Sequence, residues 1–351
     1  MMHILATHHH SRTLYPVQLR ILGSCKSGGV CFYNSIKIKS AIALFMAMLV
    51  SNTVSASPNA YITNQLEHNV SVVDLKNNKV IANIPTGKNP AGVAVCDNGR
   101  KVIVSSPEEK ALYVLDTATH KLLNEIKVGE GPLGVVCSKK ENRAYVADWY
   151  THKVSVVDIE QGKILTEIPV GKSPAGLVID NNSQRLYVAN RDSNSVTVID
   201  LKTNKTVLEI AVGKAPFGLA ISPSGDKLYA VNVHSSDVSV INTETLKKVA
   251  DIAVGEWPYC AIVDPTGKRL YVTNQEDETI SVVDLDKNSE ISKIDSGETP
   301  EGIDITADGK KLLVANWGEG NISVIDTQTL KVISVIKTGK GSRSFGRFIV
   351  N

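Results

Sequence analysis

Short apolar runs alternate with clusters of turn residues along most of the chain. From residue 58 onward, four runs rich in Val, Ile and Tyr recur within each stretch of about forty residues. Clusters such as Asp97-Asn-Gly, Ser224-Gly-Asp and Pro265-Thr-Gly separate them. Val, Ile and Tyr favour strands, whereas Gly, Asn, Asp and Pro favour turns. The pattern therefore predicts four-stranded antiparallel sheets and essentially no helix.

The runs repeat with a constant period. A turn motif, G-K/E-x-P-x-G, recurs every 42 residues and begins at Gly87, Gly129, Gly171, Gly213, Gly255 and Gly297, with a degenerate copy at Gly339. A strand motif of the type Tyr271-Val-Thr-Asn and a following V-S-V-V-D segment keep the same spacing. Seven such units account for all 294 residues of 58–351. Four strands per unit at this period predict an all-β, seven-bladed β-propeller.

The phase of the repeat predicts how the ring closes. The first unit starts at its second strand, with Tyr61, and the chain ends after a first strand that we expect over residues 344–350. The last strand should therefore pair with the first three strands in one blade and close the ring through backbone hydrogen bonds.

Residues 1–56 have the features of an export signal. Lys37 and Lys39 precede the apolar run 41–50, and Val54-Ser55-Ala56 resembles a signal peptidase site. We expect cleavage after Ala56 and a periplasmic or secreted propeller over 57–351, with an uncleaved anchor as the alternative. The leader before the apolar run is long, so we expect that the start codon is assigned too early. Lipidation at Cys25 is not expected, because Arg20 interrupts the apolar segment before it.

The net charge of the propeller does not favour binding to nucleic acid. The 33 Lys/Arg and 36 Asp/Glu from residue 57 onward leave a net charge of −3, whereas phosphate binding normally uses a concentrated basic surface. One repeat position near the ring opening alternates in sign: Lys88, Glu130, Lys172, Lys214, Glu256, Glu298 and Lys340. This mixed set suits a protein or a small polar ligand better than DNA or calcium.

The three motifs together resemble the YVTN family of β-propellers, which includes the exported YncE-like proteins of bacteria. The resemblance spans residues 58–351 and implies a seven-bladed fold. Members of the family serve as surface, periplasmic or accessory proteins, some propellers with similar repeats are lactonases or lyases, and some YncE-like proteins are reported to bind DNA. The fold alone therefore does not decide the function.

Aromatic residues collect on one predicted face. We name as the upper face the loops between second and third strands together with the blade-to-blade connections; the other loops form the lower face. We predict ligand or partner contacts there by Trp149, Tyr150, Phe217, Trp257, Tyr259, Trp317 and Arg343, with His152 and His234 as second choices. Exposed aromatic residues are common interface anchors, and packing against neighbouring loops is the alternative explanation.

Three cysteines fall within the predicted propeller. Cys260 replaces the usual glycine of the turn motif in the sixth blade, and a lone thiol has no paired ligand set for a metal. Cys96 and Cys137 lie on the innermost strands of adjacent blades and should face each other. Packed sheets lie about 10 Å apart, so we expect buried thiols, with a disulfide in an oxidising compartment as the alternative.

An enzyme is the competing prediction. The exported part contains only His68, His120, His152 and His234, and no C-x-x-C-H, P-loop or G-x-S-x-G motif is present. A lactonase-like or lyase-like site could use His152, His234 and Glu256. We expect instead a monomeric, non-catalytic binding protein without cofactor or metal, which recognises an envelope protein or a small polar ligand. Single-stranded DNA binding through stacking is a further alternative.

Overall fold

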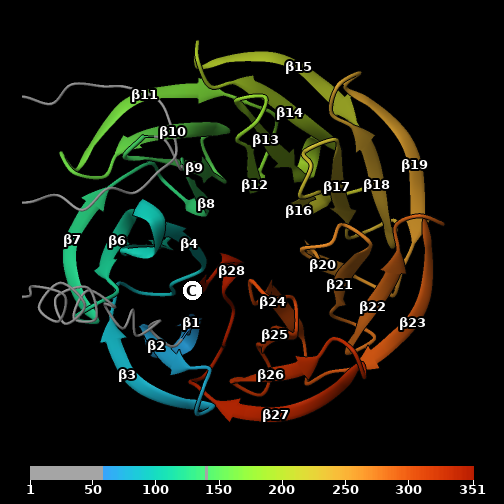
Figure 1. Cartoon of the computed structure of the whole chain (residues 1–351). Coiled ribbons are helices and arrows are strands. Elements are labelled where there is room, and N and C mark those ends of the chain that lie inside the picture. The colour runs from blue at the N-terminus through green and yellow to red at the C-terminus, as the bar shows by residue number, and fades with distance from the viewer. Residues whose placement is uncertain (1–57, 139–140) are drawn as a thin grey trace, which may run out of the picture. The chain divides into compact units, whose positions relative to one another are not determined.

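Seven sheets surround a common axis in the computed structural model, which describes residues 58–138 and 141–351 (Figure 1). The predicted seven-bladed propeller is thereby confirmed. The predicted signal peptide and Cys25 lie outside the described residues. Among the described residues, no helix is long and apolar enough to span a membrane.

Each blade has four strands, from the axis to the periphery. The innermost strands are β29 (Ile349–Val350), β4 (Gly92–Cys96), β8 (Pro132–Cys137), β12 (Pro174–Asp180), β16 (Pro216–Ile221), β20 (Pro258–Val263) and β24 (Pro300–Ile305). The second strands are β1 (Asn59–Asn64), β5 (Lys101–Ser106), β9 (Arg143–Asp148), β13 (Arg185–Asn190), β17 (Lys227–Asn232), β21 (Arg269–Asn274) and β25 (Lys311–Asn316).

The two outer layers complete the blades. The third strands are β2 (Asn69–Asp74), β6 (Ala111–Asp116), β10 (Lys153–Asp158), β14 (Ser195–Asp200), β18 (Asp237–Asn242), β22 (Thr279–Asp284) and β26 (Asn321–Asp326). The outermost strands are β3 (Lys79–Pro85), β7 (Lys121–Lys127), β11 (Lys163–Pro169), β15 (Lys205–Ala211), β19 (Lys247–Ala253), β23 (Ser289–Asp295) and β27 (Lys331–Lys337). Short 3₁₀ turns occur at Gln65–Glu67, Asp97–Gly99 and Arg191–Ser193. We number the blades 1 to 7 in the order in which the innermost strands are given.

The repeated strand motif is explained by buried contacts within each blade. The tyrosine of the motif is almost fully buried in every blade that has it, as in Tyr229 and Tyr271. The asparagine that ends the motif donates a hydrogen bond to the hydroxyl of the third strand, as from Asn232 to Ser239 (2.9 Å). The bond gives the buried amide N–H group an acceptor and the buried hydroxyl a donor. The Y-x-x-N and V-S-V segments are therefore spaced to make this bond.

The C-terminal segment closes the ring, as predicted. Strand β29 pairs antiparallel with β1, with Ile349 opposite Ala60. A second contact was not predicted: the preceding strand β28 (Phe345–Arg347) pairs in parallel with β4 of blade 2. The expected single strand over 344–350 is thus split between two blades. Gly346 permits this close pairing, since it has φ of +127° and a Cβ atom added there would collide with the Val93 carbonyl oxygen.

Glycines of the turn motif allow neighbouring innermost strands to approach closely. A Cβ atom added at Gly134 would collide with the Ala175 carbonyl oxygen, and one added at Gly176 would collide with that of Phe217. The glycine is therefore required by backbone contact between adjacent blades rather than by an unusual backbone angle.

The expectation for Cys96 and Cys137 was wrong, because the structure joins them in a disulfide. Their Cα atoms lie 5.4 Å apart, within the usual bridging range. The expectation used the spacing of parallel stacked sheets, whereas propeller blades converge toward the axis and their innermost strands are closer. The disulfide links blade 2 covalently to blade 3.

Loss of this disulfide should lower stability without changing the fold. We expect the Cys96→Ala/Cys137→Ala variant to lose about 3 kcal/mol of unfolding free energy, because the bridge restricts the unfolded chain. Denaturant unfolding of the unmodified protein with and without a reductant measures this difference in stability. In the double variant, the reductant should have no effect. Alkylation of the unreduced, unfolded protein should label Cys260 only among these three cysteines; labelling of Cys96 or Cys137 would contradict the assignment.

Candidate functional site

Seven positions, 42 residues apart, are equivalent in the repeat. In blades 3 to 7 this position is the second residue of the innermost strand. The seven positions are occupied by Ala91, Leu133, Ala175, Phe217, Tyr259, Glu301 and Arg343. The five apolar members pack in one cluster together with Phe345. Because these positions lie where the innermost strands begin, next to the blade-to-blade connections, the cluster lies at the upper end of the central channel.

Aromatic side chains form the middle of this cluster. Phe217 stacks on Tyr259 with ring centroids 4.1 Å apart, and its ring lies 4.8 Å from that of Phe345. Trp149 reaches the same group, with its ring 6.3 Å from Phe217. Phe217 and Tyr259 are buried. Two of the predicted contact residues are therefore used for internal packing, and this packing closes the channel on the upper face.

A buried ion pair completes the closure. The Nε atom of Arg343 lies 3.0 Å from Oε2 of Glu301, and the Arg343 side chain is 17% exposed. Arg343 also donates a hydrogen bond to the Tyr259 hydroxyl, while Gln275 donates to Oε1 of Glu301 (3.1 Å). Burial raises the pKa of Glu301 and the neighbouring guanidinium opposes that shift. Arg343 is thus engaged by internal partners rather than presented at the rim.

Other predicted contact residues are presented to solvent. Trp257 is 51% exposed and Tyr150 is 68% exposed, both on the upper face. Trp317 is partly buried in the contact between blades 7 and 1, where its Nε1 donates to Gln65 (2.9 Å). The exposed residues lie in blades 3 to 6, so the aromatic side chains do not form an even ring.

Contacts between neighbouring loops join these residues into one surface. The Arg191 guanidinium lies 6.0 Å from the Trp149 ring, and its Nη2 is 3.2 Å from Nε2 of His234. The ring of His234 is in turn 5.9 Å from that of Trp257. We call Trp149, Tyr150, Arg191, His234 and Trp257 the aromatic surface.

Sequence reasoning missed Arg191, although its position was informative. It follows the strand motif of blade 4 at the repeat position that holds Trp149 in blade 3 and Trp317 in blade 7. A hollow of about 320 Å³ adjoins it on the upper face. The hollow is lined by Arg191, Asp192, Asn194, Lys214, Ala215 and His234.

The remaining histidines make separate contacts. His152 is exposed, and its Nδ1 accepts a hydrogen bond from the Ser173 backbone (3.1 Å). His120, on the lower face, hydrogen-bonds the Tyr61 hydroxyl (3.0 Å). His152 and His234 therefore have different hydrogen-bond partners, Ser173 and Arg191. Throughout residues 58–138 and 141–351, no group of three or more His, Cys, Asp and Glu side chains is arranged to hold a metal ion.

Cys260 is buried and free in the sixth blade. Burial raises the pKa of its thiol well above the usual value, and the charge of Glu301 acts in the same direction. A thiol that resists ionisation is a poor nucleophile and a poor metal ligand. The departure from glycine at this position is therefore a packing feature of blade 6.

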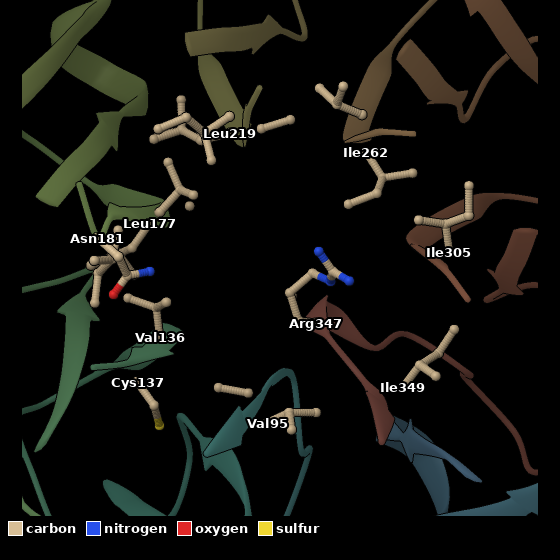
Figure 2. A pocket seen from close by; sticks show the side chains of 18 of the residues that line it. Val95, Val136, Cys137, Leu177, Asn181, Leu219, Ile262, Ile305, Arg347 and Ile349 are labelled. Carbon is tan, nitrogen blue, oxygen red and sulfur yellow. The ribbon is translucent and has the colours of Figure 1, made fainter. Parts of the chain in front are cut away.

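Below the aromatic closure, the central channel is open over a cavity of about 900 Å³ (Figure 2). Its lining runs from Phe345 to the lower-face loops that contain Asn98, Ser138 and Asn182. Most of the wall is apolar, with Leu177 among the side chains that reach it. This cavity belongs to the lower face and was not predicted from the sequence.

Two family models match the sequence. The model described as "YNCE-like beta-propeller" matches residues 52–143. The model described as "Lactonase, 7-bladed beta-propeller" matches residues 111–245 and 241–344, which is more than half of the chain. No curated protein matches the sequence.

Several solved structures share the fold at low sequence identity. Kuenenia stuttgartiensis hydrazine synthase aligns with a TM-score of 0.70 and 22% identity, over 76% of this chain and 92% of that chain. A functionally unknown protein from Desulfotomaculum acetoxidans DSM 771 aligns with a TM-score of 0.73 and 14% identity, over 82% and 97%. Dihydro-heme d1 dehydrogenase NirN in complex with DHE aligns with a TM-score of 0.62 and 14% identity, over 80% and 73%. At these identities the likeness shows the fold alone.

Proposed function

The chain belongs to the family described as "Lactonase, 7-bladed beta-propeller", and we propose that it is an exported binding protein without catalytic turnover. Its partner is another envelope protein, which it captures on the aromatic surface. The observation that carries this proposal is the exposure of Trp257 and Tyr150 on a face whose central opening is closed by packed side chains. Such a face offers an area for a macromolecule. The hollow beside Arg191 is lined mostly by polar and charged residues, unlike the apolar lining typical of small-molecule pockets.

The composition of the aromatic surface supports a protein partner. Trp, Tyr and Arg are the residue types that contribute most to binding energy in protein interfaces. Here the Arg191 guanidinium lies between the rings of Trp149 and His234, with contacts to both. These contacts hold the side chains in place before binding, which reduces the conformational entropy lost on association.

The size of the Trp257 side chain also favours a functional role. Its φ of +51° is shared within a few degrees by the residues at the equivalent repeat positions, Asn89, Ser173, Ala215 and Thr299, so the left-handed angle belongs to the repeated turn. Small or polar side chains are therefore sufficient at this position. A half-exposed indole there is not required by the turn.

The disulfide supports export. Structural disulfides persist in oxidising compartments such as the periplasm and are rare in the cytosol. The Cys96–Cys137 bridge agrees with the signal peptide predicted for residues 1–56. Both observations favour a periplasmic or secreted location.

Replacement of the exposed aromatic side chains should abolish capture. We expect the Trp257→Asn/Tyr150→Ala variant to bind its partner about 30-fold more weakly or worse, because interface anchors of this kind contribute about 2 kcal/mol or more. Asn should be compatible with the backbone, since Asn89 adopts the same angle. The measurement is affinity capture from envelope extract with quantitative mass spectrometry.

A matched control removes equally exposed apolar side chains elsewhere. Leu123 on β7 and Ile333 on β27 are each 53% exposed and lie on outermost strands. Leu123→Ala/Ile333→Ala should capture the same proteins as the unmodified chain. If the capture lists of all three proteins agree, the aromatic surface is not the binding site.

Lactone hydrolysis is the second candidate function, favoured by the lactonase model match over residues 111–344. The groups available on the upper face are His152, His234 and Glu256. Purified protein should be assayed with aliphatic and sugar lactones, together with His152→Ala and His234→Ala. Turnover above the uncatalysed rate that is lost in a folded histidine variant would replace the binding proposal with an enzyme.

A further inference from the structure

We propose that the central cavity of the lower face binds a small monocarboxylate with an aliphatic body, whose carboxylate is held by Arg347. The volume of about 900 Å³ lies within the range of small-molecule sites. This site is separate from the aromatic surface, because the packed cluster around Phe217 and Phe345 lies between them.

The wall of the cavity suits an aliphatic chain. Val95, Val136, Leu177 and Leu219 are only partly buried within the protein and reach the cavity from four different blades (Figure 2). Ile262 faces it from a fifth blade. Apolar side chains left against solvent gain free energy when an apolar ligand covers them. A ligand with a hydrocarbon body would remove this surface from water.

Arg347 supplies the polar contact. It is the only basic side chain among the residues that line the cavity in the described part of the chain. It occupies the repeat position that holds Val263 in blade 6 and Ile305 in blade 7. Figure 2 shows its guanidinium reaching into the middle of the channel. Its Nε atom pairs with the buried Asp304 carboxylate, which explains a charged residue at this apolar repeat position but not the 59% exposure of its side chain toward the channel.

Asp304 orients this guanidinium without using all of its donors. The fully buried Asp304 carboxylate accepts from Nε of Arg347 (2.6 Å) and from the backbone N–H groups of Phe348 (2.8 Å) and Ile349 (2.9 Å). Among the described hydrogen bonds and ion pairs, none uses the two terminal nitrogens of Arg347. Those two nitrogens form the planar fork that binds a carboxylate through two parallel hydrogen bonds.

The other charges at the lower mouth favour a single negative charge on the ligand. Asp97 is paired with Arg100 (2.5 Å) and lies 3.8 Å from the Lys101 ammonium. Asp180 accepts from the Asn182 backbone (2.9 Å) and has no basic partner among the described ion pairs. A guanidinium that already pairs with the Asp304 carboxylate is poorly matched to a dianion such as a phosphate monoester. A monocarboxylate needs one cation and tolerates these neighbours.

Calorimetric titration with sodium decanoate at neutral pH tests the site. We expect one decanoate per protein with a dissociation constant on the order of 100 µM. Arg347→Gln should weaken binding about 10- to 100-fold, since a charge-assisted pair is lost. Arg100→Gln is the matched control on the same face, with a 75% exposed side chain outside the cavity, and should bind as the unmodified protein does.

A second variant tests the cavity independently of the charge. Val136→Trp, directed into the channel, should fill part of it and weaken decanoate binding at least about 10-fold while Arg347 stays in place. Circular dichroism melting should show that each variant is folded. Equal affinity in Arg347→Gln and the unmodified protein would overturn the proposal. So would absence of decanoate binding at about 1 mM, or equally tight binding of decyltrimethylammonium, which has the opposite charge.

Discussion

A chain that ends at Ser344 is expected to lose cooperative folding of the propeller. The missing residues include Phe348, which is fully buried and whose carbonyl accepts a hydrogen bond from the Tyr61 backbone (2.9 Å). They also include three groups that donate to the buried Asp304 carboxylate. Removing a buried aromatic residue costs about 3–5 kcal/mol, and leaving a buried charge unpaired costs a similar amount. The total is comparable to the whole stability of a typical domain.

Thermal unfolding followed by circular dichroism measures this effect. The truncated chain should show a broad or absent transition, and Phe348→Ala should unfold cooperatively with about 3–5 kcal/mol less stability. Deletion of Asn351 alone is the control, since this residue is exposed and its removal should leave the transition nearly unchanged. A chain ending at Ser344 that melts within a few degrees of the full protein would show that the ring does not depend on its closure.

Substitution of Gly176 by alanine is expected to produce the second largest loss. The added methyl group would collide with the Phe217 carbonyl oxygen of the neighbouring innermost strand. Neither backbone can move away freely, because each is held by its own sheet. We expect about 2–4 kcal/mol of destabilisation, as for other overpacked interiors.

Cys260 provides the matched control, because it occupies the equivalent repeat position and already carries a Cβ atom. Cys260→Ala removes only the sulfur and should cost about 1 kcal/mol. Denaturant unfolding of both variants gives the comparison. If Gly176→Ala is no less stable than Cys260→Ala, close contact between blades is not the reason for the glycine.

Much of the fold could be predicted because the same four-stranded unit occurs seven times in the chain. The 42-residue period determined the number of blades, and the incomplete first and last units determined where the ring closes. The parallel pairing of β28 with β4 could not be predicted in this way. It occurs only once, where Gly346 allows the chain to cross from blade 2 to blade 1.

The candidate site was less accessible to sequence reasoning. The repeat register placed Phe217, Tyr259 and Arg343 on the upper face, but it could not reveal that their side chains would meet there and fill the channel. That outcome depends on the size and charge of all seven residues at one position. The register also contained two signals that went unused: Arg191, at the position that holds tryptophan in blades 3 and 7, and Arg347, at a position of mostly aliphatic residues.

The spacing of the blades explains the remaining error. Distances between flat, stacked sheets do not apply near the axis of a propeller, where the innermost strands converge. Cys96 and Cys137 are therefore close enough to bridge. To estimate the distance between two residues from the sequence, one needs to know how far each lies from the propeller axis. The repeat supplies that distance once the order of the strands from the axis outward is known.

Hydrogen–deuterium exchange of the protein, alone and bound to its captured partner, tests the proposed binding surface most directly. We expect slower exchange in the upper-face loops 149–152, 191–194, 234–236 and 254–257, with no change in the outermost strands. Protection confined to lower-face loops, or an unchanged pattern in a complex that is shown to persist, would contradict this expectation.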